Sequence, residues 1–311
     1  MKTTLFSSLY SCEEYRPSRR AWLGAAGAAL VAGCASTPPP APVPPVVAVP
    51  PAPPPRKPRL GLALGGGAAR GFAHIGVIQV LEEAGIRPDL VVGTSAGSLV
   101  AALYASGKSG AQLGEMAGGM DESALTDWSF PLRGLIRGEA LARYVRTNTG
   151  GQAIEAMRLP LGIVATDLGN GEPILFRRGD TGSAVRASSA VPAVFQPVQI
   201  GGREYVDGGL VSPVPVRFAR QMGAELVLAV DISAGADAGN TGDALRVLMQ
   251  TFNIMVRSLS QMELKDADVV VRPALAQGSA DFSNRPRAIQ AGRQAAQAAL
   301  PMLRSKLGLT A

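Results

Sequence analysis

Short apolar runs alternate with stretches of helical spacing from residue 60 onward. Residues 60–64 form an apolar run typical of a buried strand, and residues 72–83 then place Ile75, Ile78 and Leu81 on one face of a helix. A second apolar run, 90–92, precedes a helix of small residues over about 97–106. Strand, turn and helix in this order, twice over, predict a parallel α/β architecture.

The same patterns predict further elements along the rest of the chain. Strands are expected at 161–166, 174–176, 204–206, 226–230 and 269–271, and helices at about 139–148, 215–222, 242–264 and 286–306. No internal repeat is found. The stretch from about 107 to 158 is a candidate for a lid.

Residues 1–33 have the pattern of an export signal. Arg16, Arg19 and Arg20 precede a mildly apolar stretch of small residues, which is too short and too rich in Gly and Ala for a membrane span. The run Leu-Val-Ala-Gly-Cys at 30–34 resembles a bacterial lipobox, so Cys34 is expected to be acylated and to become the first mature residue. An uncleaved N-terminal anchor is the alternative.

Details of this signal predict the export pathway and the membrane that the protein reaches. Residues 18–23 resemble a twin-arginine export signal, which carries folded proteins; an ordinary Sec signal with two adjacent arginines is the alternative. Ala35 stands where an acidic residue would retain a lipoprotein in the inner membrane. By resemblance to that sorting rule, the protein is expected at the outer membrane, facing the periplasm.

Residues 34–59 are predicted to be a tether, and residues 60–311 the folded domain. Twelve of the 24 prolines lie within residues 38–58, a composition that prefers extended polyproline II. At about 3.1 Å per residue, such a segment would span about 60 Å. The alternative is a disordered remnant without function, since such a segment would have the same composition.

Composition limits the chemistry. Cleavage would remove Cys12 and lipidate Cys34, so the mature domain would have no disulfide, no cysteine nucleophile and no thiolate metal site. The net charge is +6, of which +2 lies in the leader. Without a block of lysine or arginine, nucleic-acid binding is not indicated, whereas weak attraction to anionic lipid is compatible with the charge.

Glycines crowd the turn between the first strand and the first helix. Gly65, Gly66, Gly67 and Gly71 surround Ala68 and Arg70. A dinucleotide fingerprint would need glycine where Arg70 stands, and no P-loop ending follows. The remaining use of such a loop is to aim backbone N–H groups at an oxyanion; a purely packing role is the alternative.

Ser95 lies between Gly93 and Gly97, after a strand and before a helix. This Gly-x-Ser-x-Gly pattern is that of a nucleophile elbow, although an ordinary tight turn shares it. The single histidine, His74, precedes Ser95, so a triad in the order serine, acid, histidine is excluded. His74 is instead expected to cap or pack near the glycine loop.

A carboxylate remains as the base. Asp207, in Val-Asp-Gly-Gly at the end of a predicted strand, is the main candidate. Its ordinary pKa of about 3.9 makes it a poor base unless an apolar site raises that value. Asp167 and Asp231 are competitors that we expect to bond to their own loops.

The chain resembles the patatin-like phospholipase family in three features that occur in the family's order: the glycine loop with Arg70, the serine elbow and the later Asp-Gly-Gly. The runs at 71–78, 165–168 and 187–192 are similar to its bacterial branch, and the resemblance spans about 60–235. It implies a three-layer α/β/α fold with a mainly parallel sheet and a Ser95–Asp207 dyad. It also implies oxyanion-hole amides from Gly65, Gly66, Gly67 and Ala68, and a supporting role for Arg70.

The resemblance further implies hydrolysis of acyl esters of phospholipids or other lipids, without metal or cofactor. The expected partners are a lipid substrate and a membrane reached through the lipid anchor. Two other functions fit the same residues: transfer of the acyl group to another acceptor, and a non-catalytic lipid-binding scaffold. The leader, the tether and the region beyond about 235 depart from a plain family member.

Overall fold

The computed structural model describes residues 56–120, 136–233, 242–275 and 284–309. The predicted signal peptide, Cys34 and most of the tether lie outside the described residues, as do residues 121–135 of the candidate lid. The chain from Pro54 onward forms one compact unit. No helix among the described residues is long and apolar enough to span a bilayer.

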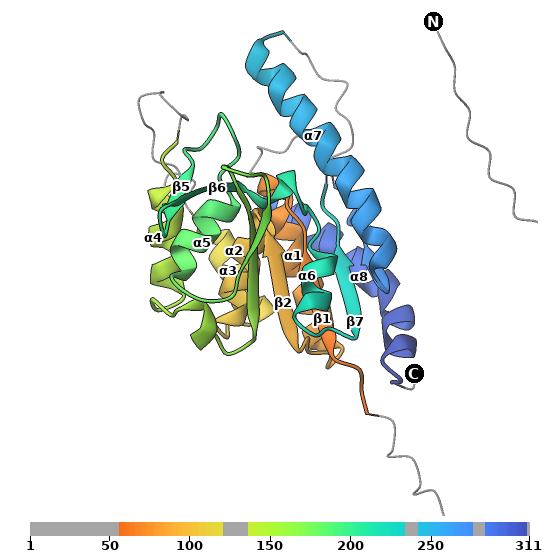
Figure 1. Ribbon diagram of the computed structural model, residues 1–311. Helices are drawn as coiled ribbons and strands as arrows, with labels where there is room; N and C mark the ends of the chain where they lie inside the picture. Colours follow the sequence, from red (N-terminus) through yellow and green to blue (C-terminus); the bar gives the residue numbers. More distant parts are fainter. Residues whose placement is uncertain (1–55, 121–135, 234–241, 276–283, 310–311) are drawn as a thin grey trace, which may run out of the picture. The chain divides into compact units, whose positions relative to one another are not determined.

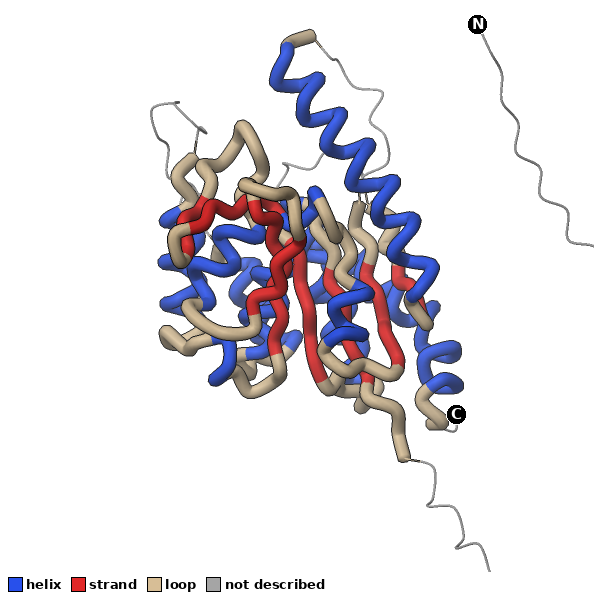
Figure 2. Tube along the Cα trace, viewed as in Figure 1, coloured by secondary structure: helices blue, strands red, loops and turns tan. Residues whose placement is uncertain are grey.

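An eight-stranded sheet lies in the middle of the described unit (Figures 1 and 2). Its strands follow the order β5-β6-β3-β2-β1-β7-β8, and β4 also pairs with β3. The bounds are β1 Leu60–Leu64, β2 Leu90–Thr94, β3 Leu161–Asp167, β4 Pro173–Phe176, β5 Val198–Ile200, β6 Arg203–Asp207, β7 Leu226–Val230 and β8 Val269–Val271.

The centre of the sheet is parallel, as predicted. β1 pairs in parallel with β2 and β7, β2 with β3, and β7 with β8. Every residue of β1, β2, β3 and β7 is buried, which is why these strands are continuous apolar runs rather than alternating ones. β4, β5 and β6 form an antiparallel extension on β3.

Helices cover both faces of the sheet, which confirms the predicted three layers (Figure 1). The main helices are α1 Phe72–Glu83, α2 Ala96–Ala105, α3 Gly110–Gly118, α4 Glu139–Asn148, α5 Thr181–Ser188, α6 Val216–Gln221, α7 Ala244–Glu263 and α8 Arg285–Lys306.

The two faces carry cores of unequal size because alternate strand residues point to opposite sides. In β1, Leu60, Leu62 and Leu64 enter the larger core, which holds buried residues of α1, α2, α3, α4, α5 and α8. Ala63 enters the smaller core, which holds α6 and Leu264, the residue that follows α7. The face covered by α6 therefore carries the smaller core.

α8 belongs to the main core although it lies beyond the part of the chain that carries the family resemblance. A Cβ added at Gly292 would lie 2.0 Å from the carbonyl oxygen of Ala73, and one at Gly76 would lie 2.0 Å from that of Ile289. The two glycines thus allow α1 and α8 to pack backbone to backbone.

Contacts with the folded domain begin slightly before residue 60. The guanidinium of Arg56 pairs with Glu225 at 2.6 Å, and the amide of Arg59 donates to the same carboxylate at 2.9 Å. Residues 56–59, assigned to the tether from composition, therefore contact the domain.

Candidate active site

The geometry of β3 explains how two segments more than a hundred residues apart meet. β4 pairs with residues 163–166 along one edge of β3. The other edge is shared by two strands: Thr94, the last residue of β2, pairs with Val164, and Asp207, the last residue of β6, pairs with Ala165. Since β2 is parallel and β6 antiparallel to β3, their carboxyl ends meet. Ser95 follows one end, and Asp207 forms the other.

Ser95 occupies a strained turn between β2 and α2. Its backbone has φ of 52° and ψ of −124°, and it is the N-cap of α2. A Cβ at Gly93 would lie 2.4 Å from the carbonyl oxygen of Gly97, and one at Gly97 would lie 2.1 Å from that of Leu64. The motif therefore needs both glycines. A strained serine at the positive end of a ten-residue helix is the arrangement of an exposed nucleophile.

Asp207 is buried beside Ser95. Its Oδ1 accepts a hydrogen bond of 2.7 Å from the amide of Gly209. Burial raises the pKa of Asp207 to about 6, against the lowering effects of that amide and of the Ser95 hydroxyl. Oδ2 is buried as well and has no hydrogen bond of ordinary geometry to any described residue. The Ser95 hydroxyl thus influences the carboxylate without forming a well-aligned bond to Oδ2.

The glycine loop offers two free amides rather than four. The amide of Gly65 donates to the carbonyl of Val230 at 3.0 Å, and that of Gly66 donates to the carbonyl of Pro213 at 2.9 Å. These two amides are engaged in holding the loop, so the four-donor prediction is wrong for Gly65 and Gly66, and Gly67 and Ala68 remain as the candidate donors.

The amides of Gly67 and Ala68 donate to no acceptor in the described part of the chain. Ala68 has φ of +50°, so two of the three non-glycine residues with positive φ among those described, Ala68 and Ser95, lie at this site. Gly66 is the point of closest approach between loop and elbow: a Cβ there would lie 3.1 Å from Cβ of Ser95.

His74 supports the loop from α1, as predicted. It is fully buried, and its Nε2 lies 2.8 Å from the carbonyl oxygen of Gly65. Burial lowers the pKa of His74 to about 4, so at neutral pH the ring is uncharged and Nε2 donates to that carbonyl. Arg70 is also buried, and it lines the pocket above Ser95.

Ser188 was not predicted as a site residue, yet it contacts the elbow directly. Its hydroxyl accepts a hydrogen bond from the amide of Ser95 at 2.9 Å and donates to the carbonyl of Val164 at 2.5 Å. Two residues later, the carbonyl of Ala190 accepts from the amide of Asp207 at 2.9 Å. In the sequence, the run at 187–192 shows only a family likeness, because serine is too common a residue for its type to indicate a role.

The competing aspartates bond to their own surroundings, as expected. Asp167 accepts from the amide of Gly169 at 2.9 Å and pairs with Arg203 at 2.8 Å. Asp231 accepts from the amide of Ser233 at 3.0 Å and pairs with Arg272 at 3.2 Å. Neither lines the pocket that contains Ser95.

Two small cavities flank the Ser95 turn. One, of about 90 Å³, is lined by the glycine loop, Arg70, Ser95 and Asp207 and is roofed by α7 through Met249, Phe252 and Val256. The other, of about 60 Å³, is almost wholly apolar. It shares Ala68 with the first and is lined mainly by Gly71, Phe72, Ile75, Ala96, Leu99, Val100, Leu103, Leu113, Met116, Ala117, Met120 and Tyr144.

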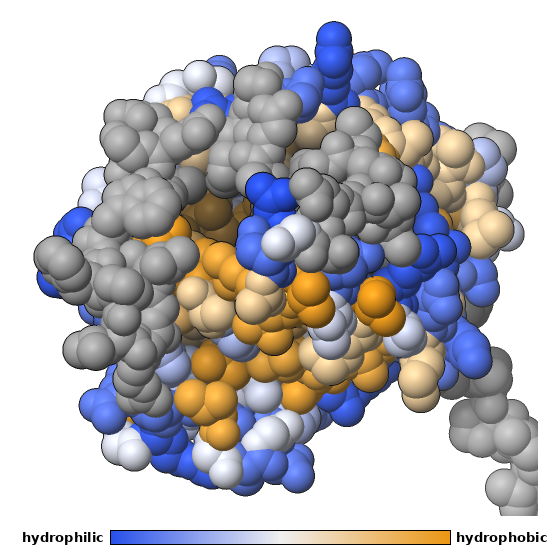
Figure 3. Space-filling view, turned by 90° about the horizontal axis from the view of Figure 1, so that it is seen from above, coloured by the Kyte–Doolittle hydropathy of each residue, from blue (hydrophilic) through white to orange (hydrophobic). Residues whose placement is uncertain are grey.

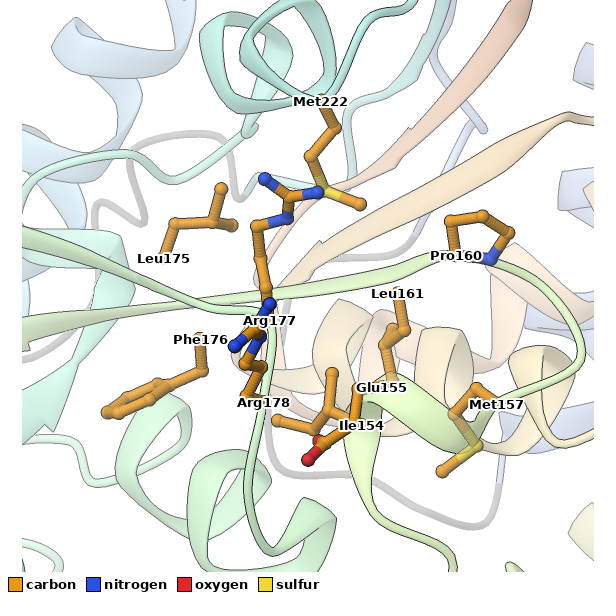
Figure 4. A pocket seen from close by; sticks show the side chains of 10 residues that line it. All are labelled: Ile154, Glu155, Met157, Pro160, Leu161, Leu175, Phe176, Arg177, Arg178 and Met222. Atoms are coloured by element: carbon orange, nitrogen blue, oxygen red, sulfur yellow. The ribbon is translucent and has the colours of Figure 1, made fainter.

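A larger cavity lies elsewhere among the described residues. Its volume is about 640 Å³, and it opens beside Pro160 and Leu161, at the amino end of β3. Figure 4 shows Arg177 and Arg178 among its lining side chains. Ser95 and Asp207 lie instead at the carboxyl ends of their strands and do not line this larger cavity. No cluster of three or more His, Cys, Asp or Glu in the described residues could hold a metal ion.

A mainly parallel three-layer fold with a serine elbow beside a buried aspartate defines a class of α/β protein distinct from the triad hydrolases. Residues 62–220 match the family model described as patatin-like phospholipase. The chain belongs to the patatin-like phospholipase family.

Several known proteins are similar to this chain. An uncharacterised NTE family protein of Mycobacterium tuberculosis is 38% identical over 209 residues, which is 66% of this chain and 58% of that protein. The patatin-like phospholipase domain-containing protein 6 of Mus musculus is 34% identical over 60% of this chain and 14% of its own length. The match thus spans little more than half of the bacterial relative and a small part of the mouse protein.

A solved structure supports the fold. The crystal structure of VipD from Legionella pneumophila superposes with a TM-score of 0.57, covering 81% of this chain and 67% of that one. The sequence identity is 15%, so this likeness concerns the fold alone.

Proposed function

We propose that this protein is a serine hydrolase of lipid acyl esters, with Ser95 as nucleophile and Asp207 as general base. One observation carries the proposal: a strained Ser95 lies beside a buried carboxylate whose pKa is raised to about 6, and the free amides of Gly67 and Ala68 lie in the adjoining loop. A base with a pKa near 6 is ionised at neutral pH and is a far better proton acceptor than an ordinary aspartate.

In the first half of the reaction, the Ser95 oxygen attacks the ester carbonyl as its proton passes to Asp207. The carbonyl π electrons move to oxygen, where the amides of Gly67 and Ala68 stabilise the negative charge. Collapse of this intermediate breaks the bond to the alcohol, which leaves with the proton from Asp207. An acyl ester on Ser95 remains.

In the second half, water attacks the acyl-enzyme. Asp207 accepts a proton from the water as its oxygen bonds to the acyl carbon, and the same amides stabilise the second oxyanion. The bond to the Ser95 oxygen then breaks, and that oxygen regains a proton from Asp207. The free carboxylic acid leaves, and the starting protonation state is restored.

The apolar cavity behind the elbow supports an acyl chain as the substrate group. It begins at Ala68 and Ala96, directly beside Ser95, and continues between α1, α2 and α3 with almost no polar lining. An acyl chain there would be removed from water, which favours esters of lipids over short polar esters. The pocket on the other side of Ser95 would receive the alcohol portion.

The sequence also suggests where the protein is located and how it is attached to a membrane. We propose that residues 1–33 are removed, that Cys34 is lipidated, and that the proline-rich segment links the domain to the outer membrane. The lipobox-like run and Ala35 support this. Labelling with a radioactive fatty acid, with Cys34→Ser as the control, tests it: label that persists in the variant contradicts the proposal.

The activity is tested with the full-length protein, a panel of phospholipids and p-nitrophenyl esters. We expect Ser95→Ala and Asp207→Asn each to lower kcat at least about a thousandfold. The matched controls Ser189→Ala and Asp231→Asn should retain activity. Hydrolysis that survives in the Ser95 variant, or that is lost with Asp231 instead of Asp207, overturns the dyad. Turnover only with an added acyl acceptor identifies a transferase and overturns the hydrolase.

A further inference from the structure

α7 exposes an unusual amount of apolar surface. Nine large hydrophobic side chains in the described residues are exposed, and six of them lie on this helix. They are Leu245, Val247, Leu248, Ile254, Met255 and Met262, with exposed fractions from 36% to 64%. Soluble proteins expose single apolar residues routinely, but a concentration of them on one element marks a surface that contacts something else.

The periodicity of α7 shows that its apolar face is wider than the part covered by the protein. Met249, Phe252 and Val256 face the catalytic pocket. Leu248 and Met255, seven residues apart, lie along the flank of that stripe and are exposed. Helical spacing puts the polar residues Arg246, Gln250, Arg257 and Gln261 together on another side. Such a helix is amphipathic with an uncovered apolar sector.

α7 is anchored near its carboxyl end. Near its carboxyl end Ser260 is buried, and the Glu263 carboxylate accepts hydrogen bonds from the Ser212 hydroxyl and, at 3.0 Å, from the Val214 amide. Its first turn, residues 244–248, is exposed throughout. Figure 1 shows α7 reaching past the end of the sheet, and Figure 3 shows hydrophobic residues gathered on the face seen from that end.

We propose that the uncovered apolar face of α7 docks on a lipid surface and brings the catalytic pocket to it. This inference rests on the proposed function for its purpose, since the same helix roofs the pocket that holds Ser95 and Asp207. Continuity between the exposed stripe and the pocket lining favours lipid over a protein partner, because a lipid could pass from one to the other.

Charge also favours a lipid surface. Among the described residues, Arg257 makes no ion pair, and Arg246 pairs with the exposed Asp243 at 3.2 Å. An amphipathic helix with a broad apolar face and arginines on its polar side is the pattern of an interfacial helix, which gains from anionic head groups.

Vesicle co-sedimentation tests the docking surface without turnover. The full-length chain would carry Ser95→Ala, and Cys34→Ser to exclude an acyl anchor, with vesicles of phosphatidylcholine and phosphatidylglycerol. We expect Leu248→Gln with Met255→Gln to lower the partition coefficient at least about tenfold. The matched control, Leu168→Gln with Met302→Gln, changes exposed residues of the same two types outside α7 and should alter it less than about twofold.

Equal binding by the α7 variant and its parent overturns the proposal. Light scattering that shows a dimer lost in the α7 variant, without vesicle binding in the parent, also overturns it, because a second copy then covers the helix. Unchanged circular dichroism and melting temperature establish that the variants fold.

Activity measurements with Ser95 intact separate this inference from the proposed function. Neither Leu248 nor Met255 lines the catalytic pocket, so the α7 variant should hydrolyse soluble p-nitrophenyl butyrate normally while losing activity on vesicles at least about tenfold. If no ester is hydrolysed but vesicle binding still depends on α7, the proposed function fails and the docking surface stands. Equal loss on both substrates overturns docking as the role of this face.

Discussion

Replacing Asp207 with asparagine should abolish catalysis and, at neutral pH, relieve the fold of a buried charge. The two side chains have nearly the same shape, and the asparagine oxygen can still accept the bond from the Gly209 amide. What changes is that asparagine never ionises. The difference in stability between the two proteins therefore isolates the effect of the Asp207 charge, because His74 and Glu263, which also have shifted pKa values, are present in both.

The size of this stability difference follows from the pKa of Asp207. Asp207 has a pKa of about 6 in the fold, above its ordinary 3.8, chiefly because of burial. The folded state thus holds this proton more tightly than the unfolded chain. The resulting stability is fully present below about pH 3.8 and is lost as pH rises through about 6, for a total of about 3 kcal/mol. Between about pH 4.5 and about pH 7.5 the change is about 2 kcal/mol.

Urea unfolding of both proteins at these two pH values measures the effect. The stability of the asparagine variant relative to the parent should rise by about 2 kcal/mol over this interval. Any constant contribution from the amide group cancels in that comparison. In parallel, kcat/KM of the parent should rise with pH through an apparent pKa of about 6. If the stability difference between the asparagine variant and the parent does not change with pH, the claim that burial raises the pKa of Asp207 is refuted.

Three further substitutions test the surroundings of Ser95. Gly66→Ala puts a Cβ 3.1 Å from Cβ of Ser95, so kcat should fall at least about tenfold; Gly118→Ala, in open space, should leave it unchanged. Ser188→Ala removes the acceptor for the Ser95 amide and should lower kcat about tenfold with KM nearly constant; a change confined to KM would contradict a positioning role. Leu99→Phe narrows the apolar cavity, so kcat/KM ratios across an ester series should move toward shorter chains, and an unaltered ratio would exclude this cavity as the acyl site.

Much of the fold could be predicted because its central strands are buried on both faces. The predicted strand at 226–230 and helices at 72–83 and 139–148 coincide with β7, α1 and α4. α3 was not predicted because its sequence, GAQLGEMAG, contains three glycines, which weaken helix propensity, and α5 was not predicted because its sequence, TGSAVRAS, has little apolar periodicity. β5 is a three-residue strand at the edge of the sheet, where pairing with β6 rather than local pattern determines the structure.

The residues that meet at the candidate site could be predicted from their motifs, but their hydrogen bonds could not. Ser95 and Asp207 stand in motifs that follow predicted strands, and the fold brings them together. The use of the Gly65 and Gly66 amides could not be foreseen, because their acceptors, Val230 and Pro213, lie far away in sequence. Ser188 was missed for the same reason: only the fold brings its hydroxyl to the Ser95 amide.

The loop that follows Asp207 connects every part of the site. The carbonyl of Ser212 accepts from the Thr94 hydroxyl at 2.8 Å, one residue before Ser95. The next carbonyl, that of Pro213, accepts from the Gly66 amide, and the Ser212 hydroxyl donates to Glu263 at the base of α7. The elbow, the glycine loop and the helix that roofs the pocket are therefore held by adjacent residues of one segment. Because α7 is anchored in that segment, contact of its apolar face with lipid would act at the place where the proposed catalytic residues are held.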